Sequence, residues 1–425
     1  MIVSPAFRGK RYAVLGLARS GLATVRALVA SGAHVVAWDS TDDARASVGD
    51  GVVLSDPREI DLAGFDGVVV SPGVPINRHP IADKAHAANV PLIGDIELFS
   101  QARPSLPPHK VIGITGTNGK STTTALIHHI VETAGIPARL GGNIGLPILG
   151  QEPLSEGGVY VLELSSYQID LCHALDCDIA VLLNITPDHL DRYDGFADYA
   201  AAKERLFTMQ HVDKVAVIAT EDDRTKMIAS RINHRLMRVS SKQVGDQSRW
   251  PSLQGPHNAQ NVAAARAVAE VLGIKASTIE EALHTYPGLP HRMERVRELG
   301  GVVYVNDSKA TNPTSTAPAL AAFPAIHWIL GGRAKTSELD ACVPYFGHVR
   351  AAYTIGESAG MFASLLKGSM PVSECGSLDI AVRAASKAAV AGETVLLSPA
   401  CASFDQFTDF EARGDAFRVA VEALA

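Results

Sequence analysis

The stretch from Lys110 to Thr124, which reads K-V-I-G-I-T-G-T-N-G-K-S-T-T-T, constrains the fold of this chain most strongly. Its apolar start at 111–114 predicts a strand, a glycine-containing loop follows, and Lys120 opens a predicted helix. Glycines let backbone N–H groups turn toward an anion, and a helix N-terminus adds partial positive charge. Lys120 can reach a phosphate and Ser121 a Mg²⁺ ion. The stretch therefore predicts a phosphate-binding loop between a strand and a helix.

The spacing of the glycines separates this loop from the strict P-loop. Five residues lie between Gly113 and Gly119, with Gly116 among them, whereas the strict motif has four residues between its first glycine and its Gly-Lys pair. An ordinary P-loop kinase or GTPase is a poorer match than a ligase-type variant. The simpler alternative, a glycine-rich turn with no ligand, is disfavoured because strand, loop and helix follow in the required order.

Length and charge narrow the class of protein. The chain has 425 residues, of which 47% are hydrophobic, and this length is typical of about three domains. Its net charge is −7 and it has no block rich in Lys or Arg, so nucleic acid and anionic membranes are not indicated as partners. No run approaches the ~18 apolar residues of a membrane span. We expect small-molecule substrates and a soluble protein.

The five cysteines are spread along the chain without C-x-x-C spacing. This pattern fits a reducing compartment and favours neither a disulfide framework nor a zinc site. We expect the cysteines to fill the core, and the protein to be cytoplasmic and monomeric.

The N-terminal part predicts a βαβ unit. Its expected strands are 11–16, 34–39 and 67–70, with a helix at 20–30. The first loop, from Gly16 to Gly21, lacks the middle glycine of G-x-G-x-x-G, so a dinucleotide pyrophosphate would lose its closest backbone approach. Asp39 ends the second strand, where an acidic residue commonly meets a ribose hydroxyl. We favour a nucleotide-sugar site over NAD, with a purely structural turn as the third possibility.

A proline-rich segment at 91–109 predicts a linker, and a second αβ unit follows it. Near-continuous apolar strands alternating with helices predict a parallel sheet covered on both faces, with ligands at the carboxyl ends of its strands. The expected strands are 159–164, 178–185 and 214–219, and the expected helices are 196–210, 222–232 and 257–272.

Three polar side chains follow strands of this central sheet. Glu163 ends one strand, and Asp188 and His189 follow another, so they can converge near bound phosphates. Oxygen ligands suit Mg²⁺, and a histidine beside them is compatible with a second ion. His189 taken alone would be a surface histidine, and Lys203 taken alone would be a solvated lysine on the next helix.

A third αβ unit begins after the helix-breaking stretch 287–292. Its expected strands are 301–307, 326–331, 350–355 and 394–397, before a long C-terminal helix. Polar loops at 307–312 and 398–403 each follow a strand and precede an expected helix. Two such loops in one sheet predict an anion-binding crevice, to which Lys335 brings a cation.

Taken together, the motifs resemble the Mur ligases, the ATP-dependent amide ligases of cell-wall precursor synthesis, over nearly the whole chain. The shared motifs are G-I-T-G-T-N-G-K-S-T-T-T at 113–124, G-G-N-I-G at 141–145, E-L-S-S-Y-Q at 163–168, N-I-T-P-D-H-L-D-R-Y at 184–193, H-N-A-Q-N at 257–261 and L-P-H-R at 289–292. N-D-S-K-A-T-N-P at 306–313 and L-L-S-P-A-C-A-S-F-D-Q-F at 396–407 are similar to the glutamate-adding branch. The D-N-P-R motif of the diaminopimelate-adding branch is absent from the sequence.

The resemblance implies an α/β fold of three domains. These would be a Rossmann-like UDP-sugar-binding domain at 1–98, a central P-loop-type ATPase/ligase domain at 99–288 and a Rossmann-like amino-acid-binding domain at 289–425. It also implies addition of D-glutamate to UDP-N-acetylmuramoyl-L-alanine, through an acyl phosphate and a tetrahedral intermediate, with ADP and phosphate as products.

The resemblance also assigns roles to individual residues. The catalytic set would be Lys120, Glu163, His189 and Lys203. ATP would be bound by Gly116, Thr117, Asn118, Gly119, Lys120, Ser121, Thr122, Asn258, Arg292 and Asp307. The UDP-sugar would contact Leu17, Ala18, Asp39, Ser40, Ser71, Asn143 and Ser165. Glutamate would contact Thr311, Lys335, Ser403 and Phe410. Two Mg²⁺ ions would be held by Ser121, Glu163, His189 and Lys203, the last as a carbamate, which reverses the expectation of a solvated lysine.

Three other functions remain as alternatives. A sibling Mur ligase or a folylpolyglutamate synthase would use another amino acid or acceptor. A P-loop NTPase or kinase would turn over ATP without an amine acceptor, and would leave the third crevice without a purpose. A nicotinamide oxidoreductase is disfavoured by Ala18 in place of the middle glycine and by the Lys120-Ser121 pair.

Overall fold

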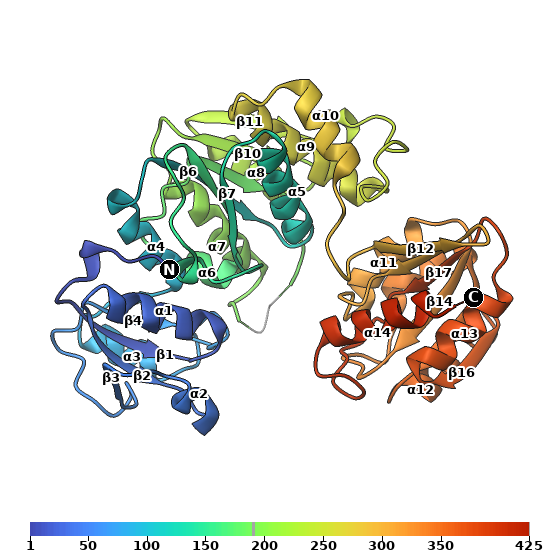
Figure 1. Ribbon diagram of the computed structural model, residues 1–425, viewed down its shortest axis with the longest axis horizontal. Coiled ribbons are helices and arrows are strands. Elements are labelled where there is room, and N and C mark those ends of the chain that lie inside the picture. The colour runs from blue at the N-terminus through green and yellow to red at the C-terminus, as the bar shows by residue number, and fades with distance from the viewer. Residues whose placement is uncertain (189–191, 425) are drawn as a thin grey trace. The chain divides into compact units, whose positions relative to one another are not determined.

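The computed structural model describes residues 1–188 and 192–424 (Figure 1). They pack into two compact units, one formed by 1–245 with 260–283 and the other by 246–259 with 284–425. The described residues form three separate sheets, and the α/β prediction is confirmed. No helix in the described ranges is both long and apolar enough to cross a bilayer.

The N-terminal sheet of the first unit has five parallel strands in the order β3-β2-β1-β4-β5. Its strands are β1 (Arg11–Leu15), β2 (His34–Trp38), β3 (Val52–Leu54), β4 (Gly67–Val70) and β5 (Leu92–Ile93), and its helices are α1 (Arg19–Ala30), α2 (Asp42–Ala46) and α3 (Ile81–Ala87). The three predicted strands are present. The two edge strands were not predicted, because each has three residues or fewer and gives no period-2 pattern.

The central sheet has six parallel strands in the order β11-β10-β9-β6-β8-β7. They are β6 (His109–Thr115), β7 (Ala138–Gly142), β8 (Gly158–Glu163), β9 (Ile179–Leu182), β10 (Val215–Ala219) and β11 (Arg235–Val239). The helices of this part are α5 (Lys120–Thr133), α6 (Ser166–Asp170), α7 (Phe196–Thr208), α8 (Asp223–Arg231), α9 (Pro256–Val271) and α10 (Ala276–Thr285). Because β6 lies between β8 and β9, the loops after these three strands meet at one edge of the sheet, where ligands bind in such folds.

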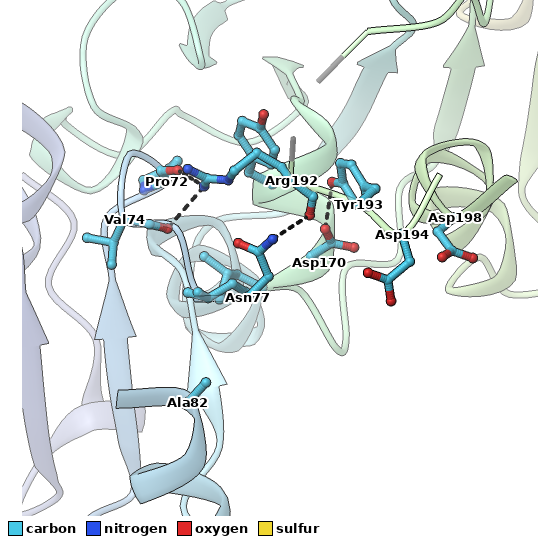
Figure 2. Close-up of a pocket in the computed structure, with 12 residues that line it drawn as sticks. Pro72, Val74, Asn77, Ala82, Asp170, Arg192, Tyr193, Asp194 and Asp198 are labelled. Atoms are coloured by element: carbon cyan, nitrogen blue, oxygen red, sulfur yellow. Dashed lines mark hydrogen bonds between the residues drawn. The ribbon is translucent and has the colours of Figure 1, made fainter. Parts of the chain in front are cut away.

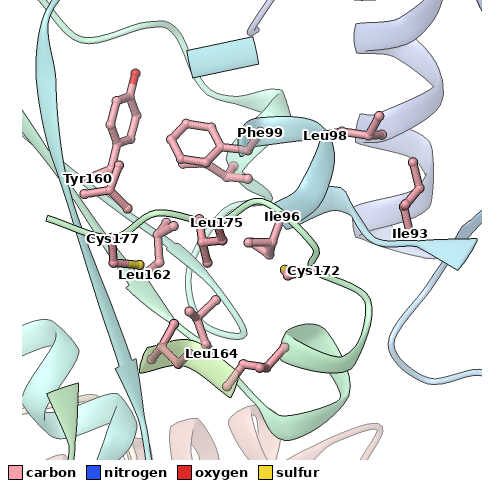
Figure 3. Packing of buried hydrophobic residues seen from close by; sticks show 14 of the residues in the cluster. Ile93, Ile96, Leu98, Phe99, Tyr160, Leu162, Leu164, Cys172, Leu175 and Cys177 are labelled. Atoms are coloured by element: carbon pink, nitrogen blue, oxygen red, sulfur yellow. The ribbon is translucent and has the colours of Figure 1, made fainter. Parts of the chain in front are cut away.

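The prediction of a linker at 91–109 is wrong for residues 95–102, which form helix α4 (Asp95–Ala102). Leu98 and Phe99 are fully buried, and the Phe99 ring lies 4.9 Å from the Tyr160 ring of β8 between centroids (Figure 3). Burial of the apolar side chains within 96–99 stabilises the helix. The proline-containing segment that follows forms only a short 3₁₀ turn at Arg103–Ser105. This helix joins the N-terminal and central parts of the first unit in one hydrophobic core.

The second unit contains a six-stranded sheet in the order β12-β13-β17-β14-β15-β16. Its strands are β12 (Glu294–Leu299), β13 (Val302–Asn306), β14 (Ile326–Gly331), β15 (Val349–Ile355), β16 (Val372–Gly376) and β17 (Thr394–Leu397), and its helices are α11 (Pro313–Ala321), α12 (Ala359–Leu366), α13 (Leu378–Ala388) and α14 (Phe410–Glu422). The sheet is parallel except at β12. Buried clusters lie on both of its faces. The helix expected directly after 398–403 begins only at Phe410.

The four predicted strands of this unit are present, and its two half-exposed edge strands, β12 and β16, were not predicted. The domain boundaries at 98 and 288 stay a prediction.

Candidate functional site

The loop between β6 and α5 requires glycine at two positions. Gly119 has φ +81° and caps α5, and Gly116 has φ +152°. A Cβ added at Gly119 would overlap Asn261 Oδ1, and one at Gly116 would lie 3.1 Å from Leu183 Cβ. The first N–H groups of α5 have no partner within the helix. A helix N-terminus that follows a glycine-containing loop in this way is a typical anion-binding arrangement.

Two amides of the loop are already engaged by Asn184, which follows β9. The N–H of Thr117 donates to the Asn184 carbonyl over 2.8 Å, and the N–H of Asn118 donates to Asn184 Oδ1 over 2.8 Å. Asn184 therefore fixes the shape of the loop. The contacts of the loop and the start of α5 with phosphate stay a prediction.

Lys203 is buried, with 1% of its surface exposed. Its Nζ donates to the Gly116 carbonyl over 2.9 Å and lies 4.6 Å from the centroid of the Tyr199 ring. The solvated lysine expected from this residue alone is wrong, because Lys203 lies on the face of α7 that packs inward. Burial, and then the charge of Lys120, lower the pKa of Lys203 well below its usual value. The site therefore makes the neutral, nucleophilic amine easier to form than it is at an exposed lysine.

Glu163 at the end of β8 has one unsatisfied oxygen. Its Oε1 accepts a hydrogen bond from Asn143 Nδ2 over 3.0 Å, while Oε2 is buried and has no hydrogen-bond partner. A buried carboxylate oxygen without a partner is costly, and a cation relieves that cost. Ser121, 5% exposed at the start of α5, follows the neighbouring strand β6. A carboxylate and a hydroxyl are oxygen ligands that suit Mg²⁺.

The predicted metal site is only partly described. His189 lies outside the described residues, and Asp188 beside it is exposed. Within the described ranges, no group of three or more His, Cys, Asp or Glu side chains is placed to hold a metal. The unsatisfied Glu163 oxygen is therefore the observation that favours a cation at this edge of the sheet.

The loops of the N-terminal sheet are closely joined. The N–H of Leu17 donates to Asp39 over 2.7 Å, and Thr41 donates to the other Asp39 oxygen. Burial alone would raise the pKa of Asp39, but these hydrogen bonds outweigh it and lower that pKa. Ser71 Oγ donates to the Gly16 carbonyl over 3.0 Å. The structure thus brings together three of the predicted uridine contacts, Leu17, Asp39 and Ser71, while Ala18 caps α1 and Ser40 is exposed.

The close approach of Gly16 and Gly21 in this turn gives a testable expectation. A Cβ at Gly21 would overlap the carbonyl oxygen of Gly16 and lie 2.9 Å from its carbon. We expect Gly21→Ala to destabilise the fold by about 1–3 kcal/mol, as overpacking does, and to lower the melting temperature in calorimetry. The control is Gly49→Ala, where a Cβ meets nothing within 4 Å. Equal melting temperatures for the two variants would contradict the close packing described here.

A cavity of about 340 Å³ lies beside the Ser71 loop and is lined by residues within 72–82, 167–171 and 192–198 (Figure 2). Arg192 crosses it, stacking at 4.3 Å on the centroid of the Tyr167 ring and donating to the carbonyl of Val74 over 3.1 Å. Asn77 Nδ2 returns a hydrogen bond to the Arg192 carbonyl over 3.1 Å. The predicted uridine loop is therefore joined to the segment that carries the predicted metal motif.

Ser165, predicted to face the UDP-sugar, caps α6. Its hydroxyl accepts from the N–H of Gln168 over 3.2 Å, and its own N–H donates to Gln168 Oε1 over 3.1 Å. The hydroxyl is thus held in place by the helix. Its contact with substrate stays a prediction.

In the second unit, the predicted glutamate contacts lie at one edge of the sheet. The loops at 307–312, 398–403 and 331–335 follow β13, β17 and β14, which are adjacent strands. Lys335 Nζ lies 3.5 Å from Thr311 Oγ1. Ser403 is buried, and Phe410 begins α14, so its N–H has no partner within the helix.

The remaining predicted ATP contacts also belong to the second unit. Burial raises the pKa of Asp307 to about 7, against hydrogen bonds from Ser398 and Met293 and the charge of Arg292. Asn258 Nδ2 donates to the Gln254 carbonyl over 3.0 Å. These residues belong to the second unit and Lys120 to the first, and their shared contact with ATP stays a prediction.

Two asparagines that contact the phosphate loop and helix α5 were not selected in the sequence analysis. Besides Asn184, Asn261 accepts a hydrogen bond from Thr123 Oγ1 over 3.1 Å. Both lie inside motifs that were recognised, but only Asn258 was selected from H-N-A-Q-N. Asn261 is the sixth residue of α9, and Asn184 lies two residues after the end of β9. These positions become informative only once the order of the strands in the sheet is known.

The chain matches two family models, the Mur ligase middle domain over residues 114–251 and the glutamate ligase domain of the Mur ligases over residues 291–401. Together with the sheets and the loops above, these matches define its class. The chain belongs to the Mur ligase family.

Its relatives within the family cover the full length. A UDP-N-acetylmuramoylalanine–D-glutamate ligase of Sphingopyxis alaskensis is 63% identical over 432 residues, covering 100% of both chains. The proteins of the same name from Novosphingobium aromaticivorans and Zymomonas mobilis are 63% and 57% identical, each covering 100% of this chain and 97% and 100% of their own.

Solved structures of other family members share the fold. A MurF ligase of Thermotoga maritima, solved in complex with ADP, superposes with a TM-score of 0.63 at 16% identity, covering 100% of this chain and 96% of its own. The UDP-N-acetylmuramate–alanine ligase of the same organism gives a TM-score of 0.61 at 15% identity, covering 97% and 99%.

Proposed function

We infer that this chain is an ATP-dependent ligase that adds D-glutamate to UDP-N-acetylmuramoyl-L-alanine and releases ADP and phosphate, in the synthesis of peptidoglycan precursors. The observation that carries the inference is the alignment of the whole chain with three relatives of that name at 57–63% identity. The free, mostly buried cysteines fit a reducing compartment, which supports a cytoplasmic reaction.

The proposed chemistry uses the carboxylate of the muramoyl-alanine arm as the nucleophile. It attacks the γ-phosphorus of ATP, the bond to ADP breaks, and an acyl phosphate forms. Lys120 offsets the charge that develops on the transferred group. The amino group of glutamate then attacks the activated carbonyl, a tetrahedral intermediate forms, and phosphate leaves as the amide bond is completed.

Mg²⁺ would be held by Glu163, through its unsatisfied Oε2, and by Ser121 at the start of α5. When bound, it neutralises phosphate charge. His189 is proposed as a further ligand on the resemblance alone. Asn143 donates to the other Glu163 oxygen and so orients the carboxylate.

We propose that Lys203 reacts with CO₂ to form a carbamate. The neutral amine attacks the carbon, an N–C bond forms and a proton is released, which turns a cation into an anionic oxygen ligand. Burial and the neighbouring Lys120 lower the pKa of Lys203, and this supports the presence of the neutral amine.

Substrate binding would be divided among three parts of the chain. The UDP-sugar is assigned to 1–98, through Leu17, Asp39 and Ser71. ATP is assigned to 99–288, and glutamate to 289–425, through Thr311, Lys335, Ser403 and the backbone of Phe410. We further propose that the enzyme acts as a monomer.

Phosphate release tests the proposed function. We expect it to require UDP-N-acetylmuramoyl-L-alanine and D-glutamate together, because the acyl phosphate forms only on a bound acceptor and is consumed only by the amine. The measurement is phosphate release with each substrate omitted in turn. Rapid release by enzyme and ATP alone, unchanged by either substrate, would support an NTPase instead.

A further inference from the structure

Arg413, on the second turn of α14, is among the largest fully buried side chains of the protein, with 1% of its surface exposed. Its Nε donates to Ser308 Oγ over 2.9 Å, and its Nη2 donates to the Ser308 carbonyl over 2.7 Å. Its Nη1 lies 3.5 Å from the Gly331 carbonyl. All three contacts are to neutral oxygens at the carboxyl ends of β13 and β14.

A buried arginine normally has a carboxylate partner, because an unpaired charge inside a protein is costly. No carboxylate in the described ranges forms an ion pair with Arg413. The Asp405 carboxylate favours the charged guanidinium electrostatically, but its Oδ2 already accepts from the N–H of Glu357 over 2.9 Å. Burial lowers the pKa of Arg413 to about 10, so the guanidinium stays charged at neutral pH. The positive charge is therefore not neutralised by the protein.

This charge lies behind the crevice proposed for glutamate. Ser308, which Arg413 contacts twice, donates its hydroxyl to the carbonyl of Phe410 over 2.8 Å. A Cβ added at Gly332 would lie 3.2 Å from Arg413 Nη1, so the loop leading to Lys335 passes directly over the guanidinium. Arg413 thus connects the loops after β13 and β14 with the start of α14.

We propose that Arg413 is a positioning and specificity-determining residue that makes the crevice select an amino acid with a carboxylate side chain. Its buried charge favours a second anion in the crevice, and its hydrogen bonds fix the loops that carry the contacts. In the low dielectric of a buried site, such a charge acts over several ångströms without direct contact. The inference rests on the proposed function, since it assumes that this crevice binds glutamate.

The test compares D-glutamate with D-glutamine, which has the same shape without the charge. For Arg413→Met we expect kcat/KM with D-glutamate to fall by roughly 10- to 100-fold, the range for losing an interaction with a charged group. The fall should lie mainly in KM for glutamate, with KM for ATP and for the UDP-sugar unchanged. Activity with D-glutamine should change little, so the glutamate-to-glutamine ratio should fall by the same factor. Arg413→Lys, which keeps the charge, should keep most of the ratio.

The matched control is Arg418→Met on the same helix, because Arg418 is already paired with Glu294 and Asp415. We expect it to lower the melting temperature without changing the ratio. If Arg413→Met does not fold, Arg413→Gln, which can still donate to Ser308, is measured in its place. An unchanged ratio in a folded neutral variant would overturn the proposal for Arg413. Failure of the wild-type enzyme to use D-glutamate would instead overturn the proposed function.

Discussion

Lys203→Ala is expected to abolish nearly all ligase turnover, by roughly 1000-fold, which is the upper range for losing one charge-stabilising group in a transition state. The side chain is buried against Gly116 in the phosphate loop and against Tyr199. Its replacement removes the proposed carbamate and leaves the Gly116 carbonyl without its donor. The measurement is ADP formation with all substrates present.

Rescue distinguishes the carbamate from a purely structural lysine. Short-chain carboxylates added to Lys203→Ala should restore part of the activity by occupying the place of the carbamate, while Lys203→Arg, which cannot be carbamylated, should stay inactive. Lys226→Ala serves as the control, because Lys226 is an exposed lysine of α8 that pairs with Asp223 on the same helix. Wild-type turnover by Lys203→Arg would rule out the carbamate.

Lys120→Ala is expected to lower turnover by about 100-fold or more, because it removes a cation proposed to offset the charge on the transferred phosphate. Lys120 begins α5, and its Nζ now donates to the Thr117 carbonyl over 2.9 Å. Removing it leaves the turn at Gly16 and Ser71 untouched. Binding of the UDP-sugar should therefore remain nearly intact in calorimetric titration.

The informative result is whether Lys120→Ala lowers turnover without lowering the affinity for the UDP-sugar. If the affinity for the UDP-sugar falls together with turnover, the nucleotide-sugar and ATP sites are not on separate parts of the chain. A melting temperature equal to that of the wild type must accompany the result, so that loss of folding is not mistaken for loss of catalysis.

Most of the strands that were predicted from sequence are largely buried. Long apolar runs such as β8 and β14 give a clear signal, because both faces of a parallel sheet are covered. The edge strands β3, β12 and β16 are partly exposed; β3 has only three residues, and β12 and β16 mix charged with apolar residues. These strands form by pairing with a neighbouring strand, and the local sequence pattern gives no information about that pairing.

The position of Lys203 was, in contrast, readable from the sequence. Tyr199, Lys203 and Leu206 are spaced i, i+4 and i+7, which places the lysine in the middle of the buried stripe of α7. The expectation of a solvated lysine relied on the usual exposure of lysine and not on this spacing. The same error affected segment 91–109, where the prolines outweighed the apolar spacing that forms α4.

Other parts of the site depend on long-range packing. Asn184 reaches the phosphate loop because β9 pairs with β6, and Asn261 reaches it from α9. Arg413 is 105 residues from Ser308, its main contact. No local motif joins these residues, so their partners become evident only in the folded chain.

The most direct test of the proposed ligase is a competition among amino acids. The enzyme is incubated with UDP-N-acetylmuramoyl-L-alanine, ATP, Mg²⁺ and an equimolar mixture of D- and L-amino acids, and the products are analysed by mass spectrometry and chiral chromatography. We expect a single adduct carrying one D-glutamyl residue, with one ADP formed for each adduct. Incorporation of another amino acid, or ADP formed without any adduct, would contradict the assignment of this chain as a D-glutamate-adding ligase.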